Sequence, residues 1–581
     1  MDTRAVVHAL NHIGDLLELS GAGRFRSGAY RNAARAIRDM PTDQLHSLVR
    51  AGELAQVRGI GPSTLSVIVE LIETGESSYL ERLRAEVPEG LVELLDIPGF
   101  GPERISKLHA DLGVDSLDTL EAAARDGRLA ALPRMGSRTV AKILAGIERV
   151  REQRGMALYP HALVEANLLL VVVAGHSSVE RAAVAGMVRR KCEVIGEIDI
   201  VAAVRGDCAA VAAELTSVPN MREPSKATDG SVAVRLVDGT RLNLHCVQAG
   251  EFAVALWRAT GSPEHVREIE QHAKTRGLTV ARNRLLDTKR TPKPIASEAE
   301  FYAALGLPYI EPELREGLGE VRAAIDNELP ALITADDIRG VLHCHTQYSD
   351  GSASIDQMVA SARARGWSYL GISDHSRAAA YAGGLSTEAV YAQHAEIDRI
   401  NDELRGASSD FRVLKGIEAD ILIDGRLDYE PELLDQFDYA IGSVHSRFAL
   451  DQAAMTERVL RAMDDPHLTI LGHPTGRLLL RREPYAIDIE SILAKAAALG
   501  VAIELNADPR RLDLDWRHCQ VAKRLGCAIE IGPDAHSVAG LSNVEIGVGI
   551  ARKGWLGPAD VLNATGSADV LKWAVSRRAG A

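Results

Sequence analysis

Hydrophobic residues follow two different periods along this chain, and the change of period divides it. Before residue 150 apolar side chains recur every three or four positions, as in 5–19 and 30–38, which predicts short amphipathic helices separated by glycine-containing breaks. After residue 167 short apolar runs alternate with polar positions, which indicates strands. From residue 340 onward such runs alternate with helical segments, and this order predicts a parallel sheet.

The middle of the chain is expected to mix strands with helices. The run LLLVVVAG (168–175) is expected to form a buried strand, and SSVERAAVAGMV (177–188) a helix. Two alternating runs, 193–204 and 232–247, are expected to form strands. Residues 263–335 are expected to be helical and rich in loops, with an exposed turn at TKRTPKP (288–294).

Seven apolar runs in the C-terminal region each end in polar, small or metal-competent residues. Helical segments such as 354–366 and 491–500 separate them. Loops at the C-terminal ends of parallel strands converge on one mouth when the sheet closes into a barrel, so these strand ends are expected to share one site. The runs are 341–345, 369–375, 413–420, 439–445, 469–474, 502–508 and 528–536.

Six histidines and three carboxylates lie at these strand ends. Imidazole and carboxylate ligands together suit zinc, manganese or iron. Any one histidine taken alone is more often a packed or surface residue, but nine such residues at six of these seven strand ends favour one polynuclear metal site. His394, His467 and His518 are assigned structural roles. The candidate ligands are His343, His345, Asp350, His375, Glu418, His445, His473, Asp534 and His536.

Composition narrows the classes of protein that fit. The net charge of −14 excludes a nonspecific polycationic binder, and six cysteines without a CxxC pair give no support to a disulfide framework or zinc finger. The start MDTRAVVHALNHIGD lacks the features of a signal peptide, and the longest apolar run is far shorter than the ~20 residues that span a bilayer. We expect a cytoplasmic monomer without a membrane partner, associated with the nucleoid when it binds DNA.

Three glycine-containing turns, each followed by an amphipathic helix, recur at 57–72, 95–112 and 132–147. Glycines let the backbone approach a phosphate, and a helix N-terminus aims N–H groups at it. The pattern resembles the helix-hairpin-helix, which binds the DNA backbone without reading sequence. The third copy departs from it, because Arg134 stands in place of its first glycine. The alternative is that the three turns are ordinary corners between helices. The candidate DNA-binding residues are Gly59, Gly61, Gly99, Gly101 and Gly136.

Residues 1–330 resemble a family X DNA polymerase of the DNA polymerase beta type. The segments that carry the resemblance are 27–37, the first two hairpins, 185–200, 259–265 and 300–316; the last, followed by a metal-rich domain, is typical of the bacterial members. The resemblance implies a nucleotidyltransferase palm in which three carboxylates hold two magnesium ions. The corresponding positions here are Glu197, Asp199 and Asn243.

The polymerase site departs from the family pattern at several positions. Asn243 is neutral and a poor ligand for a hard cation, and Met187 removes the hydroxyl of a phosphate-binding turn. Val67 stands where some members have a Schiff-base lysine. Arg189 and Arg190 remain and are expected to contact phosphates. These losses favour a palm that is inactive or severely weakened; if it is active, magnesium binds there.

The motifs HCHTQYSDG, SDH, GIEAD, SVHS, GHPTGR and PDAHS resemble the polymerase-and-histidinol-phosphatase (PHP) domain. The resemblance implies a distorted (β/α)7 barrel with three metal ions: one held by His343, His345, Glu418 and Asp534, a second by Asp350, His375 and His536, and a third by His445, His473 and bridging Glu418. Asp374 and Asp420 are expected to orient imidazoles. Arg477 and Arg510 are candidates for phosphate contacts.

The sequence thus predicts a multidomain chain that acts on gapped, nicked or 3′-end DNA. The favoured function is metal-dependent hydrolysis at DNA 3′ ends, including abasic sites. The alternatives are a gap-filling polymerase, a small-molecule phosphatase and a non-catalytic DNA-binding scaffold. The expected domains are an all-α helix-hairpin-helix region (1–85 and 86–150), an α+β palm (151–255), a thumb and linker (256–335) and the barrel (336–581).

Overall fold

The structure is a computed structural model, and it describes residues 3–21, 24–38, 40–88, 90–97, 100–133, 135–217, 221–222, 230–236 and 239–579. The chain forms two compact units, Met1–Arg154 and Gly155–Ala581. Each unit has its own apolar core. Among the described residues, no helix is both long enough and apolar enough to span a bilayer.

The first unit is helical, as its apolar period predicts. Leu10, Ile13 and Leu16 of the first helix are fully buried, so its apolar face forms the centre of the core. The one-turn helices η1 (Leu54–Gln56) and η2 (Leu94–Asp96) precede two of the hairpins. The helices are α1 (Thr3–Leu19), α2 (Arg24–Ile37), α3 (Thr42–Ala51), α4 (Pro62–Thr74), α5 (Ser78–Glu86), α6 (Gly90–Glu93), α7 (Pro102–Leu112), α8 (Leu117–Arg125) and α9 (Ser137–Gln153).

Glycines cap the second helix of each predicted hairpin. Gly61, Gly101 and Gly136 are the N-cap residues of α4, α7 and α9, all in extended conformation. Gly59 has a φ of 99°, which only glycine adopts without strain. Gly99 and Arg134 lie outside the described residues.

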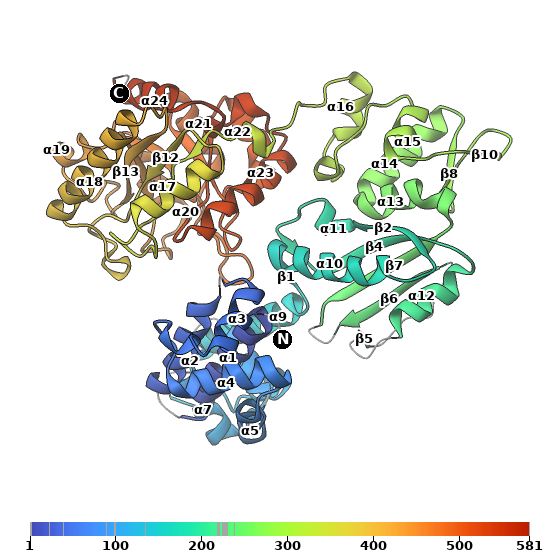
Figure 1. The fold of residues 1–581 in the computed structure, drawn as a ribbon, viewed down its shortest axis with the longest axis horizontal. Coiled ribbons are helices and arrows are strands. Elements are labelled where there is room, and N and C mark those ends of the chain that lie inside the picture. The colour runs from blue at the N-terminus through green and yellow to red at the C-terminus, as the bar shows by residue number, and fades with distance from the viewer. Residues whose placement is uncertain are drawn as a thin grey trace. The chain divides into compact units, whose positions relative to one another are not determined.

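The middle of the chain folds around a five-stranded sheet of order β2-β4-β7-β6-β5 (Figure 1). Strands β4 and β7 are parallel and the other neighbours are antiparallel. The runs 193–204 and 232–247 form strands as predicted. The elements are β1 (Ala157–Leu158), α10 (Tyr159–Ala174), β2 (Val179–Ala185), α11 (Gly186–Arg189), β3 (Val194–Ile195), β4 (Glu197–Val204), α12 (Cys208–Thr216), β5 (Met221–Arg222), β6 (Ser231–Leu236) and β7 (Arg241–Val247).

The strand predicted at 168–175 is wrong, because this run belongs to helix α10. An apolar run of this length fits a strand and a helix equally well, and proline in the first turn supports the helix. The side chains that α10 buries are spaced by three and four residues, as one helical face requires, and they are Ala162, Ala166, Leu169 and Val173. The other face leaves Leu168 and Val171 exposed.

The helix predicted at 177–188 is also wrong. Residues 179–185 form strand β2, which pairs antiparallel with β4 from Val179 opposite Val204 to Ala185 opposite Asp199. Alanine has the highest helix propensity of any residue, but tertiary context overrides propensity, and here the ladder of hydrogen bonds to the buried strand β4 outweighs it.

Residues 249–326 form a small helical module with a three-stranded antiparallel sheet that the sequence did not suggest. The segment 288–294 is exposed, as predicted, although its end forms a short strand. Trp257, Phe301 and Tyr302 pack together in the core. The elements are η3 (Ala249–Glu251), α13 (Phe252–Thr260), α14 (Pro263–Thr275), β8 (Thr279–Ala281), β9 (Arg284–Leu286), β10 (Pro292–Lys293), α15 (Glu298–Ala304), η4 (Pro312–Leu314) and α16 (Glu320–Asp326).

The C-terminal region is the predicted barrel of seven parallel strands, arranged in chain order. A parallel bridge between Cys344 and Ala535 joins the segments that follow the first and last strands and nearly closes the sheet. The strands are β11 (Gly340–Val341), β12 (Tyr369–Ile372), β13 (Arg412–Asp420), β14 (Tyr439–Ser443), β15 (Leu468–Leu471), β16 (Ala502–Asn506) and β17 (Ile529–Gly532).

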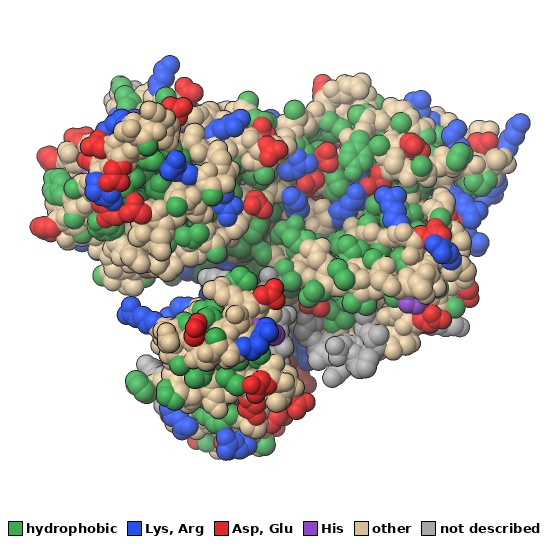
Figure 2. Space-filling view, in the orientation of Figure 1, with side chains coloured by type: hydrophobic (Ala, Val, Ile, Leu, Met, Phe, Trp, Pro, Cys, Tyr) green, Lys and Arg blue, Asp and Glu red, His purple; other side chains and the backbone are tan. Residues whose placement is uncertain are grey.

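Helices surround the barrel strands (Figure 1). They are η5 (Ala335–Asp337), α17 (Ile355–Ala364), η6 (Ala380–Ala382), α18 (Thr387–Gly406), α19 (Pro431–Leu434), α20 (Gln452–Ala462), α21 (Ile489–Leu499), α22 (Trp516–Leu525), η7 (Ala539–Ser542), α23 (Asn543–Lys553), η8 (Pro558–Asp560), η9 (Leu562–Ala564) and α24 (Ser567–Ala579). The strands are buried on both faces, which explains their continuous apolar runs. Figure 2 shows basic and acidic side chains interspersed over the visible surface.

Candidate metal centre

The nine predicted ligands lie together at one mouth of the barrel. Glu418 belongs to the C-terminal half of β13, and the other eight lie within a few residues of a strand's C-terminal end or on the loop that follows it. Since parallel strands place these ends on one side, residues up to 193 positions apart (343 to 536) converge. His343, His345, Glu418 and His473 are almost completely buried.

Glu418 lies within 4 Å of five of the imidazoles, and the longest of these contacts joins its Oε2 to His345 Nε2 at 3.7 Å. Its Oε2 lies 2.9 Å from His375 Nδ1 and 3.5 Å from His343 Nε2. Its Oε1 lies 3.2 Å from His445 Nε2 and 3.1 Å from His473 Nε2. Both carboxylate oxygens therefore lie between imidazoles, as expected of a bridging ligand.

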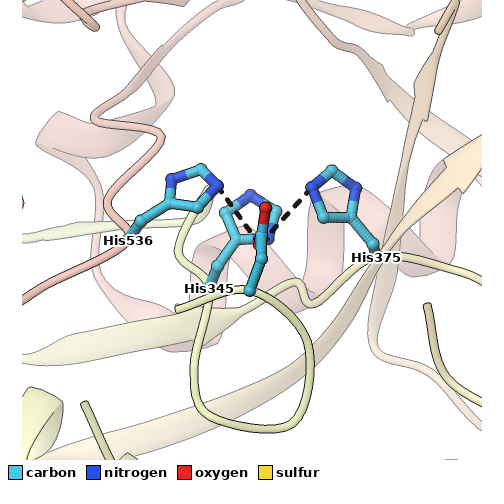
Figure 3. Close-up of side chains that lie close together, drawn as sticks. His345, His375 and His536 are labelled. Carbon is cyan, nitrogen blue, oxygen red and sulfur yellow. Dashed lines mark ion pairs between the residues drawn. The ribbon is translucent and has the colours of Figure 1, made fainter. Parts of the chain in front are cut away.

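Two aspartates occupy the other side of the cluster. Asp534 Oδ1 lies 3.2 Å from His345 Nε2, and Asp350 Oδ1 lies 3.3 Å from His536 Nε2 and 3.7 Å from His375 Nε2. Figure 3 shows His345, His375 and His536 directed toward a common point. The ring centroids of His345 and His536 are only 4.2 Å apart.

Eight of the nine candidate ligands fall into three overlapping groups, each with its atoms within 4.8 Å of one another, and His473 belongs to none of them. The groups are His345, Asp350, His375 and His536; His343, His345 and Asp534; and His375, Glu418 and His445. These groups overlap with the three ligand sets that the PHP resemblance implies, but His345 and His375 are each shared. How ions divide the ligands stays a prediction.

Several buried atoms in this cluster have no hydrogen-bond partner among the residues that the structure describes. They are Nε2 of His343, both ring nitrogens of His345, Nδ1 of His375, Nδ1 of His473 and Oε2 of Glu418. Leaving such groups unpaired costs about 1–3 kcal/mol each, so a protein retains them where another partner binds. Imidazole nitrogens and carboxylate oxygens are ligands of divalent cations, and the residues present fit a metal centre.

Glu504 is a functional residue that the sequence analysis missed. It is fully buried on β16, and its Oε1 accepts a hydrogen bond from His343 Nδ1 at 2.5 Å. This bond leaves Nε2 of His343 directed at Glu418 and Asp534. Asn506, two residues further on the same face, donates to Asp534 at 3.0 Å. The i, i+2 spacing of Glu504 and Asn506 in the run AIELNAD is the signal that could have identified them.

Of the two predicted orienting aspartates, the structure places only one against an imidazole. Asp420 Oδ1 lies 2.7 Å from His445 Nδ1. Asp374 is directed elsewhere, so this expectation is corrected. Its carboxylate accepts hydrogen bonds from the backbone and hydroxyl of Thr346 and from Gln393, and it thereby holds the loop that follows His345.

Two ligand residues have strained backbones. His473 has a φ of 23° and Asp534 a φ of 48°, in the left-handed region that L-residues seldom occupy. Such conformations cost of order 1–3 kcal/mol and concentrate at functional sites. The backbone N–H of His473 also donates to Glu504, which supports this conformation.

Mutual electrostatics set the protonation of the cluster. Burial alone would lower the pKa of His445, but Glu418 and Asp420 raise it to about 10. Burial, together with the neighbouring His536, lowers the pKa of His345 to about 4. Burial opposes ionisation of Glu418 and Asp534, yet the adjacent imidazoles hold the pKa of both carboxyls well below the usual range. Ionised carboxylates and a neutral imidazole such as His345 are the forms that bind metal ions, whereas His445 must release its proton to bind one.

The arginine nearest to the centre is Arg511, not Arg477. The Arg477 guanidinium donates to Asp515 at 2.5 Å, to the Arg511 carbonyl at 2.9 Å and to Glu193 at 3.3 Å. These bonds leave Arg477 unsuited to the phosphate contact expected from the sequence, so that expectation is corrected. Arg511 Nε lies 3.4 Å from Asp534, and burial opposes its charge while Asp534 and Glu418 raise its pKa. Arg510 is exposed on the same loop, and its contact with phosphate stays a prediction.

Four parts of the chain match known domain families. Residues 1–77 match a helix-hairpin-helix domain, 91–149 a SAM-like helix-hairpin-helix tandem, 255–316 the DNA polymerase beta thumb and 342–508 the PHP domain. The whole chain is similar to the DNA polymerase/3′-5′ exonuclease PolX of Bacillus subtilis (strain 168), with 36% identity over 574 residues that cover 98% of this chain and 99% of that protein. The chain belongs to the bacterial family X DNA polymerases with a C-terminal PHP domain.

The PHP region also resembles shorter proteins. A probable phosphatase of Syntrophotalea carbinolica is 27% identical over 240 residues, which cover 39% of this chain and 91% of that protein. A probable phosphatase of Clostridium acetobutylicum is 34% identical over 137 residues, 22% of this chain and 53% of that protein.

The palm of this family X chain brings Glu197, Asp199 and Asn243 together. Asp199 on β4 lies directly opposite Asn243 on β7. The amide Nδ2 of Asn243 donates to Glu197 Oε2 at 3.0 Å and to Asp199 Oδ1 at 3.1 Å. His245 Nε2 lies 3.3 Å from the same Asp199 oxygen. Protein donors thus occupy the carboxylates that would otherwise face cations.

The two palm arginines are not free for phosphates, which corrects that expectation. Arg189 pairs with Glu298 of α15 at 2.5 Å and donates to Thr260 at 2.8 Å. Arg190 pairs with Glu316 at 2.9 Å and donates to the Thr260 carbonyl. Met187, which follows Gly186 in the chain, is partly buried against the palm core. Val67, in the first unit, is buried in an apolar core.

Proposed function

We propose that the PHP barrel hydrolyses phosphodiester bonds at DNA 3′ ends, including abasic ones, and releases nucleotides. The observation that supports this most is the convergence of nine candidate ligands, whose buried ring nitrogens include several without a hydrogen-bond partner among the described residues. Divalent cations bound there, of the manganese, zinc or iron class, supply positive charge that stabilises a reacting phosphoryl group. Three ions for the nine ligands are part of the proposal.

The chain's own residues provide the rest of the site. Glu504 and Asp420 hold two imidazoles in one orientation each through Nδ1. Arg511, held beside Asp534, offers a guanidinium for nonbridging phosphate oxygens. Arg377, Arg447 and Arg510 add positive charge on the loops that follow β12, β14 and β16, which suits a polyanionic strand.

DNA rather than a small phosphate ester is the proposed substrate. The helix-hairpin-helix and thumb modules that precede the barrel are those of a DNA polymerase family, and the relative from Bacillus subtilis is named a 3′-5′ exonuclease. Gapped, nicked and recessed 3′ ends are the forms that such modules would deliver.

We also propose that the palm has lost most or all polymerase activity. Asn243 supplies an amide where a third carboxylate would bind cations, and Arg189 and Arg190 are paired with glutamates. A neutral amide neither neutralises two magnesium ions nor helps to ionise a primer hydroxyl.

Nucleotide release from a 3′-labelled gapped duplex tests the proposed function. We expect release to require Mn²⁺, to fall more than about 100-fold in His343→Ala and His345→Ala, and to persist in the control His518→Ala. Release that survives both cluster substitutions would contradict the assignment of the site. Tight binding of gapped DNA without turnover in any metal would instead favour a scaffold.

A gap-filling polymerase is the second candidate function. It is favoured by the name of the Bacillus subtilis relative, a DNA polymerase/3′-5′ exonuclease, and by Glu197 and Asp199, which share one face of β4. Primer extension into a one-nucleotide gap that is lost in Glu197→Ala would establish it. Under the main proposal the wild type and Glu197→Ala show equal, negligible extension.

A small-molecule phosphatase is distinguished by substrate. The similarity to a probable phosphatase favours that reading of the barrel alone. We expect kcat/KM for a DNA 3′ end to exceed that for a nucleoside monophosphate. A faster monophosphate reaction would favour the phosphatase.

A further inference from the structure

Tyr381 is an exposed aromatic residue at the edge of the metal centre. Its side chain is 73% exposed, although Ala379 and Ala382, which flank it in the chain, are buried. The centroid of its ring lies 6.2 Å from the ring of His375 and 6.3 Å from that of His445. A large apolar ring therefore borders the ligands while most of its surface faces solvent.

The loop that carries Tyr381 is fixed at its base. Ser376 and Leu385 form a β-bridge, and the Leu385 N–H donates to the His375 carbonyl at 2.9 Å. Gly384 approaches so closely that a Cβ there would lie 1.9 Å from the Ser376 carbonyl oxygen. The bridge follows directly after the ligand His375, so the loop keeps a set position relative to the centre.

The apex of this loop is anchored on both sides of Tyr381. Ala379 is fully buried and Ala382 is 4% exposed, and the Ala382 N–H donates to the Ala379 carbonyl at 2.9 Å. This hydrogen bond closes the one-turn helix η6, and two buried alanines flank the exposed tyrosine. The backbone of Tyr381 is thus held in place, whereas its ring is not packed in the core, as a preformed platform for a ligand would require.

A flat, exposed aromatic face beside a phosphoesterase centre fits a nucleobase. The base of a terminal nucleotide lies beside its own phosphate, and every base offers a π-face, so stacking does not depend on sequence. Exposing a tyrosine ring to water has no structural benefit of its own, because its apolar surface would be more stable buried.

We propose that Tyr381 is the stacking platform for the nucleobase of the 3′-terminal nucleotide. The inference rests on the proposed hydrolysis of DNA 3′ ends and names what that site recognises besides phosphate. Tyr381 would hold the terminal residue so that its phosphodiester lies at the metal centre, for any of the four bases. The hydroxyl group is not needed for this role.

Two gapped duplexes that differ only in the 3′-terminal residue test the proposal. One ends in a nucleotide and the other in a tetrahydrofuran abasic residue, and kcat/KM is measured for the full chain with Mn²⁺. The wild type should prefer the base-bearing end, and Tyr381→Ala should reduce this preference about 10-fold, as expected for loss of one stacked base. Tyr381→Phe should keep the preference, as should Tyr391→Ala, a control at an exposed tyrosine of α18.

Other outcomes overturn the inference. If Tyr381→Ala lowers kcat/KM equally for both ends, the residue supports the centre rather than the base. If Tyr381→Phe behaves like Tyr381→Ala, the hydroxyl group and not the ring makes the contact.

A binding measurement separates this inference from the proposed function. The full chain, with EDTA to prevent hydrolysis, is titrated into DNA that carries 2-aminopurine at its 3′ terminus. Fluorescence quenching by the wild type and Tyr381→Phe, but not by Tyr381→Ala, supports stacking even if no hydrolysis is found. Equal quenching by all three proteins overturns the inference. Absence of hydrolysis by the wild type on either end contradicts only the proposed function.

Discussion

At the scale of single residues, two carboxylates outside the candidate ligand set contact imidazoles within it. Glu504 accepts a hydrogen bond from His343 Nδ1, and Asp420 occupies the same position at His445. Each bond selects one tautomer and leaves Nε2 available, which strengthens the imidazole as a ligand. Asn506 completes this arrangement at Asp534.

Replacing Glu504 tests this arrangement directly. We expect Glu504→Gln to weaken divalent cation binding about 10–100-fold, because an amide at this position no longer selects the same His343 tautomer. Competition with a chromogenic chelator measures the affinity. Glu490→Gln, at an exposed position of α21, is the matched control, and equal affinity in both variants would contradict the role of Glu504.

At the scale of elements, the helices that cover the barrel are attached by buried polar groups as well as apolar ones. Helix α18 packs on β13 and buries His394, whose ring lies 4.8 Å from that of Phe437 in an edge arrangement. Burial, together with Lys415, lowers the pKa of His394 to about 4. The sequence analysis assigned this histidine a structural role, and its burial agrees with that.

The lowered pKa of His394 predicts a pH dependence of stability. In the unfolded chain His394 takes up a proton below about pH 6.5, whereas in the folded chain it stays neutral down to about pH 4. Its contribution to stability is therefore complete above pH 6.5 and is lost as the pH falls toward 4. We expect this residue to lower the free energy of unfolding by about 2 kcal/mol between pH 8 and pH 5.

Urea unfolding of the wild type and His394→Gln at both pH values measures this contribution. Glutamine is neutral throughout, so the variant should lose less stability on acidification than the wild type. An identical loss in both proteins would show that His394 does not contribute.

At the scale of the whole molecule, the second unit joins the palm, the thumb and the barrel through buried charges. Glu193 of the palm is 8% exposed, lies 3.3 Å from Arg477 Nη2 and accepts from Trp516 Nε1 at 3.1 Å. Glu316, after the thumb helices, pairs with Arg190 of the palm and with Lys553 of α23. Arg190, which was expected to contact a phosphate in the palm, is therefore part of a network that reaches the barrel.

Removing Glu193 should destabilise this unit. We expect Glu193→Ala to lower the free energy of unfolding by about 3 kcal/mol, because Arg477 and Trp516 lose their shared buried acceptor. Glu180→Ala, which removes the exposed pair with Arg205, should cost less than about 1 kcal/mol. Thermal unfolding measures both, and equal shifts of Tm would argue against the buried network.

The period of apolar residues was enough to predict the seven barrel strands and the helices of the first unit, because side-chain direction along a strand or helix is a local property. It failed at 168–188, where a short apolar run and an alanine-rich segment each fit either element, and pairing with β4 decided between them. The nine ligand residues could be listed in advance because strand ends of a parallel barrel meet at one mouth.

Which side chains support those ligands was decided only by the tertiary structure. Strand register and loop conformation decide that Glu504, and not Asp374, contacts an imidazole. They also decide that Arg511, and not Arg477, lies beside the centre. The contact between Glu504 and His343 joins residues 161 positions apart in the chain. Likewise, the palm acids and Asn243 could be named from the chain, but their mutual hydrogen bonds follow from the register of β4 and β7. A sequence determines the direction of a side chain within its element, whereas its partners are determined by how the elements pack.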